Sequence, residues 1–247
     1  MNLLTLVGLG PGGPGGLTAD ARAALEGADL FCGYTGYIDL IRPLWPATPC
    51  LSTPMTRELE RCRLALEEAA GGKQVAMVCS GDAGVYGMAG PVLELAPAYP
   101  TVEVRVVPGV SALLSGAAVL GAPLMNDFAV VSLSDLLTPW GAIEARLRAA
   151  AAGDFSLCLY NPSSKKRKDY LQRACDLVLK HQSPETVCGY VKNIGREGEE
   201  GHVLTLRELR GTQVDMFTTV WIGNSQTKNI GGKMVTPRGY RVPETEE

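Results

Sequence analysis

Short hydrophobic runs along the chain alternate with segments of helical periodicity. The first run, 3–9, is apolar and ends at a cluster of glycines, which predicts a buried strand. Thr18 then supplies an N-cap for a helix that extends to Glu26. Similar runs predict further strands at 28–32, 74–79, 102–107, 128–132, 155–160, 186–191 and 218–223.

Helical patterns lie between these runs. The clearest starts at Thr53 and Pro54 and stops at Gly71, with an apolar stripe of Leu59, Cys62, Leu66 and Ala69. Other helices are expected up to Leu95, after residue 111, and on both sides of the 155–160 strand. Alternating strands and helices predict two α/β domains with mostly parallel sheets flanked by helices. Gly121, Ala122 and Pro123 mark the expected boundary, which gives domains 1–122 and 123–247.

Three glycine-rich loops follow predicted strands directly, at 8–16, 80–87 and 108–109. In open α/β sheets, ligands bind beyond the carboxyl ends of the strands. The three loops are therefore expected on one edge of a sheet and at a ligand site. The alternative is that each loop is only a tight turn.

The first loop formally satisfies GxGxxG with Gly8, Gly10 and Gly13, the pattern of dinucleotide sites. Two prolines, Pro11 and Pro14, remove amides that would contact a phosphate. The acidic residue expected at the end of the second strand is missing, and no Walker lysine follows any of the loops. The sequence therefore argues against binding of NAD or ATP.

Composition narrows the class of protein. The chain has 247 residues, 46% hydrophobic and 20% charged, and its net charge of −3 does not favour nucleic acid or an anionic membrane. It has 7 cysteines without a CxxC pair and only 2 histidines, so neither a disulfide framework nor a metal site is expected. The N-terminus lacks the pattern of a secretory signal, and no apolar stretch is long enough to span a bilayer. We expect a soluble, cytoplasmic protein with reduced thiols.

Three segments together resemble one family. GLGPGGPGGLTADARAALEGAD at 8–29, SGDAGVYG at 80–87 and VPGVSA at 107–112 are similar to three signatures of the tetrapyrrole (corrin and porphyrin) methylases. The resemblance extends essentially from end to end. Further segments are closest to the branch that methylates ring carbon C17 of precorrin-3B and contracts the ring to precorrin-4, in cobalamin biosynthesis. These are GYTGYIDLI at 33–41, SGDAGVYGMAG at 80–90, LYNPSSKKR at 159–167, IGNSQT at 222–227 and MVTPRGY at 234–240.

The resemblance implies a fold, a cofactor and a set of contacts. The fold has S-adenosylmethionine in a cleft between two α/β domains, with S-adenosylhomocysteine as product, and the family usually forms a homodimer. The substrate is a tetrapyrrole. The implied cofactor contacts are Pro11, Ser80, Gly81, Asp82, Val85, Ser111, Ala112, Asn161, Asn193, Ile194 and Thr236, and Gly12 lies in the loop that lines the substrate trough. The sequence departs from the family at Asn161, where relatives often carry methionine, and at Ala83, where many carry proline.

Methyl transfer from a sulfonium is an in-line displacement with a neutral leaving group. The protein mainly has to align the reacting atoms in a dry site, so no metal or nucleophilic side chain is needed. Ring contraction requires at most a proton donor or acceptor. Asp82, Asp127 or a carboxylate of the substrate are the candidates. Asp82 has an alternative role as the N-cap of a helix starting near Tyr86.

Lys165, Lys166, Arg167 and Lys168 form the densest basic run. We expect this run to begin a helix, where cations oppose the helix dipole. That cost predicts an anionic ligand, and the acetate and propionate arms of a precorrin fit; Lys192 and Arg196 extend the patch. A solvated helix face is the alternative. Two other functions stay open: a related methylase acting at another ring carbon, and a non-catalytic protein that binds a tetrapyrrole or nucleotide.

Overall fold

The computed structural model describes residues 2–164 and 166–240. Within it the chain forms two compact units, Met1–Ala112 and Leu113–Glu247. The division comes before the boundary predicted at 122, because the helix that ends at Leu120 packs on the second unit. A Cβ atom added to Gly116 in this helix would lie 2.7 Å from the Ile194 side chain, and it would also meet Trp221.

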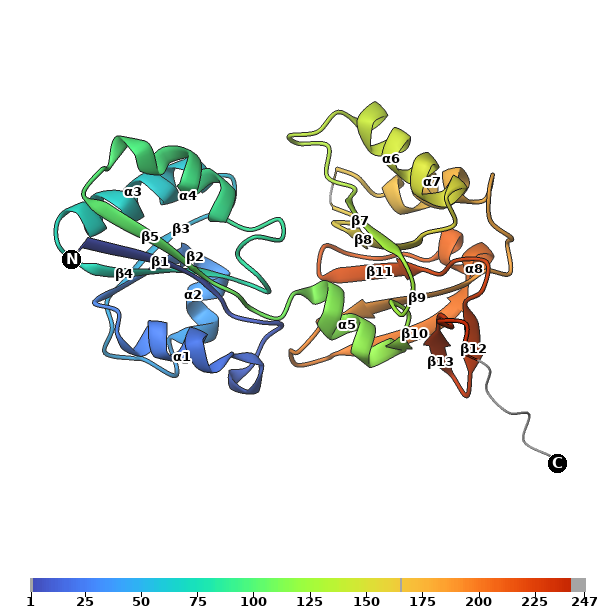
Figure 1. The fold of residues 1–247 in the computed structure, drawn as a ribbon, viewed down its shortest axis with the longest axis horizontal. Helices are drawn as coiled ribbons and strands as arrows, with labels where there is room; N and C mark the ends of the chain where they lie inside the picture. The colour runs from blue at the N-terminus through green and yellow to red at the C-terminus, as the bar shows by residue number, and fades with distance from the viewer. Residues whose placement is uncertain (1, 165, 241–247) are drawn as a thin grey trace. The chain divides into compact units, whose positions relative to one another are not determined.

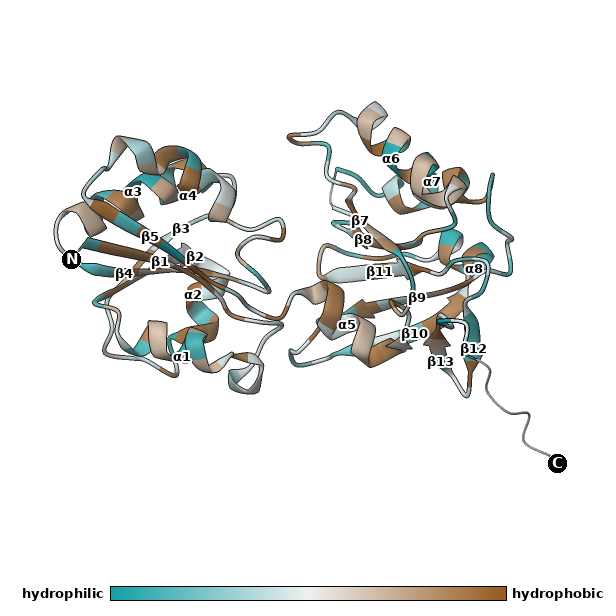
Figure 2. Ribbon diagram, in the orientation of Figure 1, coloured by the Kyte–Doolittle hydropathy of each residue, from teal (hydrophilic) through white to brown (hydrophobic). Residues whose placement is uncertain are grey.

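The first unit is built on a sheet of five parallel strands in the order β3-β2-β4-β1-β5 (Figure 1). The strands are β1 Asn2–Gly8, β2 Leu30–Tyr34, β3 Cys50–Thr53, β4 Gln74–Cys79 and β5 Val102–Val107. Parallel strands that are covered on both faces are apolar throughout, which explains why β1, β2 and β4 could be predicted. Figure 2 shows these strands in the brown of hydrophobic residues.

Helices cover both faces of this sheet. On one face, α1 (Ala19–Glu26) and α2 (Thr35–Ile41) bury residues such as Leu25 and Ile38. On the other, α3 (Glu58–Ala70) and α4 (Ala89–Leu95) bury Leu66 and Val92. The predicted N-cap is confirmed, since the Thr18 hydroxyl accepts a hydrogen bond from the Ala21 amide. Two short 3-10 turns, Pro14–Gly16 and Ala96–Ala98, complete the unit.

The start predicted for α3 was wrong. Thr53 ends strand β3, and the helix begins at Glu58. Of the predicted stripe, Cys62, Leu66 and Ala69 are buried, but Leu59 is exposed. Leu59 lies in the first turn of α3, so the stripe begins at the second turn, where the helix reaches the sheet.

The second unit contains a mixed sheet in the order β10-β9-β11-β8-β7. Its strands are β7 Phe128–Ser132, β8 Ser156–Tyr160, β9 Val187–Lys192, β10 Glu200–Thr205 and β11 Thr218–Ile222. The α/β fold class is confirmed, but the expectation of a mostly parallel sheet does not hold here. Only β7 and β8 pair in parallel, and the other three pairings are antiparallel. For β10 the reason is the short connection 193–199, which returns the chain directly alongside β9; a parallel pairing needs a longer crossover.

Helices α6 (Trp140–Ala152), α7 (Tyr170–Val178) and α8 (Leu206–Gly211) cover one face of this sheet, burying Leu147, Leu171 and Leu206. On the opposite face lies α5 (Ala112–Leu120), whose Gly116 faces Trp221 and whose Leu120 faces Gly189. A small additional sheet joins β12 (Lys228–Ile230), β13 (Lys233–Val235) and β6 (Gly121–Ala122). Among the described residues, no helix has the length and apolarity required to cross a bilayer.

Candidate functional site

The loops after β1, β4 and β5 meet at the carboxyl edge of the first sheet, as predicted from three neighbouring parallel strands. Gly10 and Gly81 exchange two backbone hydrogen bonds of 3.0 and 2.7 Å. A Cβ atom at Gly8 would lie 2.5 Å from the Gly109 nitrogen and 2.8 Å from the Gly81 oxygen. A Cβ atom at Gly109 would overlap the same Gly81 oxygen. We call Gly8, Gly81 and Gly109 the glycine junction; the close approach of the loops leaves no room for a Cβ atom at Gly8 or Gly109.

Asp82 ties two of these loops together. Its Oδ1 accepts a hydrogen bond from the Gly84 amide at 2.7 Å, and its Oδ2 accepts one from the Gly109 amide at 3.0 Å. Both carboxylate oxygens are therefore engaged by the backbone. The alternative role as a helix cap was wrong, because α4 begins only at Ala89. The geometry gives Asp82 a positioning role in the glycine junction.

The other candidates of the first unit surround this junction. Gly81 is buried with a φ of +66°, and a Cβ atom there would meet Ser111 and Ala112 at 3.6 Å. Glycine is thus required at 81 by its backbone conformation, whereas the packing around it would accept a Cβ atom at ordinary van der Waals distances. Ser80, Ser111 and Ala112 follow β4 and β5 at the same edge, and Val85 lies in the 80–87 loop. Pro11 and Gly12 are half-buried in the loop after β1.

Apolar side chains lie exposed on loops at this edge of the first unit. Met55 follows β3, Val85 and Tyr86 follow β4, and Val110 follows β5. By contrast, Cys79, the last residue of β4, is buried, and burial raises the pKa of its thiol to about 11. The edge therefore offers glycine backbone and apolar side chains for contact with a ligand. Cys79 belongs to the core, as predicted.

The carboxyl edge of the second sheet carries two asparagines in the left-handed region. Strands β7, β8 and β9 run in the same direction, since β11 is antiparallel to both β8 and β9. Asn161 directly follows β8 with a φ of +53°, and Asn193 directly follows β9 with a φ of +52°. Asparagine tolerates this conformation better than most residues. The side chain of Asn161 donates to the Ser132 hydroxyl, and that of Asn193 to the Gly198 carbonyl.

Two further cofactor candidates lie inside the second unit. Ile194 is buried and faces Gly116 of α5. Thr236 is fully buried, and its hydroxyl contacts the Pro123 carbonyl and the Thr227 hydroxyl at 2.8 Å each. Both side chains are therefore occupied in packing within the unit.

The predicted role of the basic run needs correction. Lys165 lies outside the described residues; Lys166 and Lys168 are exposed, and the helix after the run, α7, begins only at Tyr170. The run is thus a loop, and the helix-dipole argument for an anionic ligand does not apply. Arg167 is mostly buried, and its Nη1 lies 3.2 Å from Oδ1 of Asp135. Its charge already has a partner within the protein.

Asp127, the second acid–base candidate, lies at the amino end of its strand. It directly precedes β7 and is exposed, whereas Ser132 and Asn161 lie at the carboxyl edge. A strand of this length spans roughly 17 Å at about 3.3 Å per residue. Asp127 is therefore well separated from the asparagine edge.

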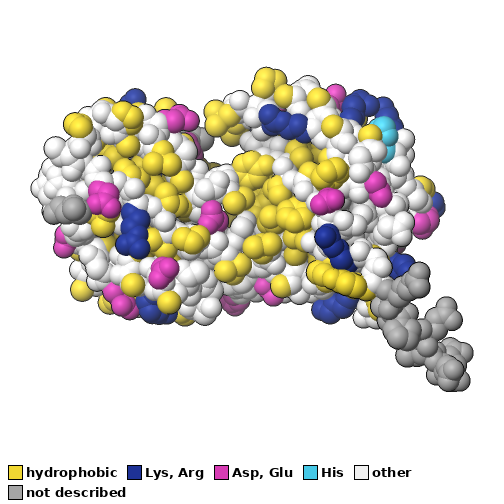
Figure 3. Space-filling view, viewed as in Figure 1, with side chains coloured by type: hydrophobic (Ala, Val, Ile, Leu, Met, Phe, Trp, Pro, Cys, Tyr) yellow, Lys and Arg dark blue, Asp and Glu magenta, His cyan; other side chains and the backbone are white. Residues whose placement is uncertain are grey.

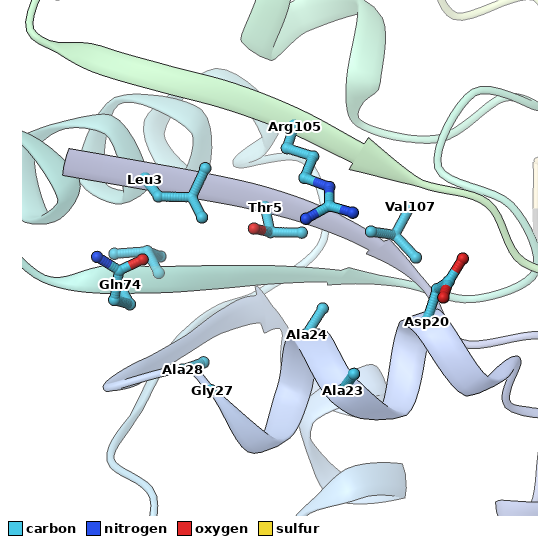
Figure 4. A pocket seen from close by; sticks show the side chains of 11 residues that line it. Leu3, Thr5, Asp20, Ala23, Ala24, Gly27, Ala28, Gln74, Arg105 and Val107 are labelled. Carbon is cyan, nitrogen blue, oxygen red and sulfur yellow. The ribbon is translucent and has the colours of Figure 1, made fainter. Parts of the chain in front are cut away.

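A cavity of about 320 Å³ lies between α1 and strands β1 and β5 of the first unit (Figure 4). Small residues such as Ala24 of α1 and Gly27 directly after it form one wall, and Thr5 and Arg105 lie on the strands opposite. None of the predicted site residues lines it. This cavity runs along the strands instead of at their carboxyl ends, so we do not assign it to the site.

Sequence reasoning missed one polar network in the second unit. Asp135 accepts hydrogen bonds from Arg167 and from the Tyr170 hydroxyl, and these two partners hold the pKa of its carboxyl below the usual range. In the sequence, Arg167 is one of several consecutive basic residues, and nothing indicates that it pairs with Asp135, 32 positions away.

The chain matches the sequence profile of the tetrapyrrole (corrin/porphyrin) methylases over residues 3–210. A protein of Salmonella typhimurium described as a probable cobalt-factor III C(17)-methyltransferase is 46% identical over 241 residues, which are 97% of this chain and 100% of that protein. A protein of Methanocaldococcus jannaschii with the same description is 41% identical, over 96% of this chain and 98% of that protein.

Solved structures give a consistent result. The crystal structure of the methyltransferase CobJ has a TM-score of 0.88 and 36% identity, covering 95% of this chain and 99% of that one. A cobalt precorrin-4 methyltransferase, CbiF, has a TM-score of 0.74 at 22% identity, covering 90% of this chain and 95% of that one. The second similarity concerns the fold alone.

Proposed function

Because the chain belongs to the tetrapyrrole (corrin/porphyrin) methylase family, we propose that it methylates ring carbon C17 of a corrin precursor with S-adenosylmethionine and contracts the ring. The product side would comprise S-adenosylhomocysteine and precorrin-4 or its cobalt-containing counterpart. The names of the two curated relatives, similar over nearly their whole lengths, support a cobalamin-pathway methyltransferase and favour cobalt-factor III as substrate. Precorrin-3B, the metal-free alternative, is the second substrate to test.

The observation that carries the proposal is the glycine junction with its apolar surroundings. S-adenosylmethionine presents a flat adenine base, which needs close backbone approach and apolar contact area. Gly81 lies directly beside Ser111 and Ala112, and Val85 and Val110 are exposed at the same edge. We propose that Ser80, Gly81, Val85, Ser111 and Ala112 contact the cofactor.

S-adenosylmethionine supplies an activated methyl group whose leaving group is a neutral thioether. The contribution of the protein is then alignment and exclusion of water. Asp82 serves this by fixing the loop that carries Gly81 and Val85 through its bonds to Gly84 and Gly109. Because Asp82 already holds the loop through a backbone hydrogen bond to each oxygen, we propose that it has a positioning role and that a carboxylate of the substrate is the proton donor or acceptor of the ring contraction.

In the second unit we propose substrate contacts at the carboxyl edge of β7 and β8. The exposed cations Lys166 and Lys168 suit the acetate and propionate arms of a corrin precursor, and the exposed Asn161 lies at the same edge. Arg167 is not available to those arms, since it pairs with Asp135.

The cofactor part of the proposal is tested by Val85→Asp with Val106→Asp as the matched control. Both valines are partly exposed, but Val106 lies on the edge strand β5 and outside the loops. We expect the affinity for S-adenosylhomocysteine, measured by calorimetry, to fall about tenfold or more only in Val85→Asp, because a desolvated carboxylate replaces an apolar contact. Equal effects in both variants would remove the 80–87 loop from the cofactor site.

The reaction is tested with S-adenosylmethionine that carries a labelled methyl group. We expect one labelled methyl group per tetrapyrrole and an equal amount of S-adenosylhomocysteine, measured by mass spectrometry. A labelled product methylated at a carbon other than C17 would assign the chain to a different methylase of the family.

A further inference from the structure

Two leucines are exposed at the tip of the loop between β7 and α6. Leu136 is 73% exposed and Leu137 is 98% exposed. Hydrophobic side chains that project together from a soluble protein mark surfaces that contact a ligand or partner. Figure 1 shows this loop, 133–139, extending from the end of β7 before the chain enters α6, and Figure 3 shows hydrophobic side chains over the same part of the second unit.

The start of this loop is fixed to strand β8. The Leu133 amide donates to the Tyr160 carbonyl at 2.9 Å, and the Ser134 amide donates to the Ser132 hydroxyl at 3.2 Å. The same Ser132 hydroxyl accepts the Asn161 side chain at 2.9 Å. The loop therefore leaves the sheet in a defined direction.

The middle of the loop is held by an ion pair. Nη1 of Arg167 lies 2.7 Å from the Ser134 hydroxyl and 3.2 Å from Oδ1 of Asp135, while the Tyr170 hydroxyl donates to Oδ2 at 2.6 Å. The Arg167 side chain is only 14% exposed, so this pair is screened by water less than an ordinary surface pair. Asp135 is the residue directly before the two leucines.

The end of the loop leads into a cluster of ring contacts at the start of α6. The Trp140 ring lies 4.4 Å from the Tyr170 ring, and the Arg173 guanidinium lies 4.1 Å from the centre of the Trp140 ring. Trp140 also donates to Glu144. Both ends and the middle of the loop are thus anchored, and the two leucines project from it. A ligand that binds the leucines therefore loses little binding free energy to ordering of the loop backbone.

We propose that Leu136 and Leu137 form an apolar contact for the macrocycle of the tetrapyrrole substrate, and that Asp135, Arg167 and Tyr170 are the positioning residues that hold this contact. The inference rests on the proposed function. The exposed cations Lys166 and Lys168 lie on the neighbouring loop after β8. An apolar tip next to cations complements a flat macrocycle that carries carboxylate arms, whereas a second protein surface would not require this combination.

The test compares Leu136→Ala/Leu137→Ala with Ile230→Ala, an exposed aliphatic residue of strand β12 in the same unit. We expect the KM for cobalt-factor III to rise about tenfold or more in the double variant only, from loss of buried apolar area in the complex. The kcat and the Kd for S-adenosylhomocysteine should stay within about twofold of the wild-type values, as the contact is proposed for the substrate alone. The exposed leucines leave no cavity on truncation, so the fold survives.

The positioning role is tested with Asp135→Asn, alone and combined with Leu136→Ala/Leu137→Ala. Asp135→Asn should raise KM and leave kcat unchanged, and its effect should largely vanish when the leucines are already absent, because both act through one contact. A merely structural role would give additive effects on KM and a loss of kcat.

Three results for the double leucine variant would overturn the inference. They are an unchanged KM for the tetrapyrrole, a weakened affinity for S-adenosylhomocysteine with KM unchanged, and a molar mass by light scattering that differs from the wild-type value. A changed molar mass would identify a second copy of the chain as the partner of the leucines. A wild-type protein that transfers no methyl group to any tetrapyrrole would defeat the proposed function itself, which is a separate outcome.

Discussion

Replacing Gly109 by alanine tests the glycine junction most sharply. The added Cβ atom would overlap the Gly81 carbonyl oxygen and lie 2.6 Å from the Gly8 carbonyl carbon. Both neighbours are backbone, so the overlap can be relieved only by moving a loop. The movement also separates the Gly109 amide from Oδ2 of Asp82.

The size of the effect follows from these two losses. Overpacking costs about 1–3 kcal/mol, and a lost hydrogen bond to a charged group about 1.5–3 kcal/mol, so roughly 2.5–6 kcal/mol is expected. At about 2–4 °C per kcal/mol for a chain of this size, Tm should fall by roughly 5–24 °C. The affinity for S-adenosylhomocysteine should fall as well, because the loop that carries Gly81 shifts.

The matched control is Gly15→Ala in the loop after β1. A Cβ atom there meets nothing within 4 Å, and the residue lies in a 3-10 turn. Its stability should stay within about 0.5 kcal/mol of the wild type. The assays are differential scanning calorimetry and titration with S-adenosylhomocysteine. If Gly109→Ala melted and bound like Gly15→Ala, close loop packing would not be what requires glycine at 109.

Three other expectations follow from the structure. Asp82→Asn should keep the hydrogen bond from the Gly84 amide and lose the one from the Gly109 amide, since an amide side chain has a single acceptor oxygen. The affinity for S-adenosylhomocysteine, measured by calorimetry, should therefore fall severalfold, and an unchanged affinity would contradict the positioning role. Thiol reagents at neutral pH should modify Cys50 in the folded protein long before the six buried cysteines, because burial raises the pKa of thiols such as Cys32 to about 12. If mass spectrometry showed that two or more thiols react rapidly, burial would not be what protects the other cysteines. The pKa of Asp135 is lowered in the folded state, so its stabilising contact is present above the ordinary aspartate pKa and is lost as the pH falls through the folded value. Asp135→Asn should therefore lower Tm at neutral pH but not in strong acid. An equal Tm difference at both pH values would show that the Asp135 charge does not stabilise the fold.

Much of the first unit could be predicted from hydrophobic pattern alone. Strand β4 is buried on both faces, and the edge strand β5 carries four valines in six residues, so both were predicted with their observed bounds. The short strand β3 was missed because Cys50–Thr53 at the sheet edge is only partly buried and carries no apolar run. Helix α2 was missed for a related reason: the turn-rich segment 33–41 offers no clear N-cap side chain.

The second unit shows where pattern fails. Strand β10 is an edge strand with three exposed residues at its start, so no alternating signal identified it. Without β10, the antiparallel return after β9 could not be seen, and a parallel sheet was expected. The glycine-rich loops of the candidate site could be predicted because glycines that directly follow a predicted strand are visible in the sequence. The pairing of Arg167 with Asp135 could not be found, since it depends on how two loops meet in space.

The product of the purified protein with S-adenosylmethionine tests the central claim most directly. Cobalt-factor III and precorrin-3B would each be supplied, and the product analysed by mass spectrometry and carbon NMR. With either substrate the account predicts a tetrapyrrole that is methylated at C17 and has a contracted ring. With precorrin-3B, whose bridging carbon already carries a hydroxyl group, no redox cofactor is needed: the product is heavier by one methylene, the extruded carbon becomes the carbonyl of an acetyl group, and carbon NMR shows the acetyl methyl signal. A methylated product that retains the full-size macrocycle would contradict ring contraction, and the absence of any methylated tetrapyrrole would contradict the proposed function.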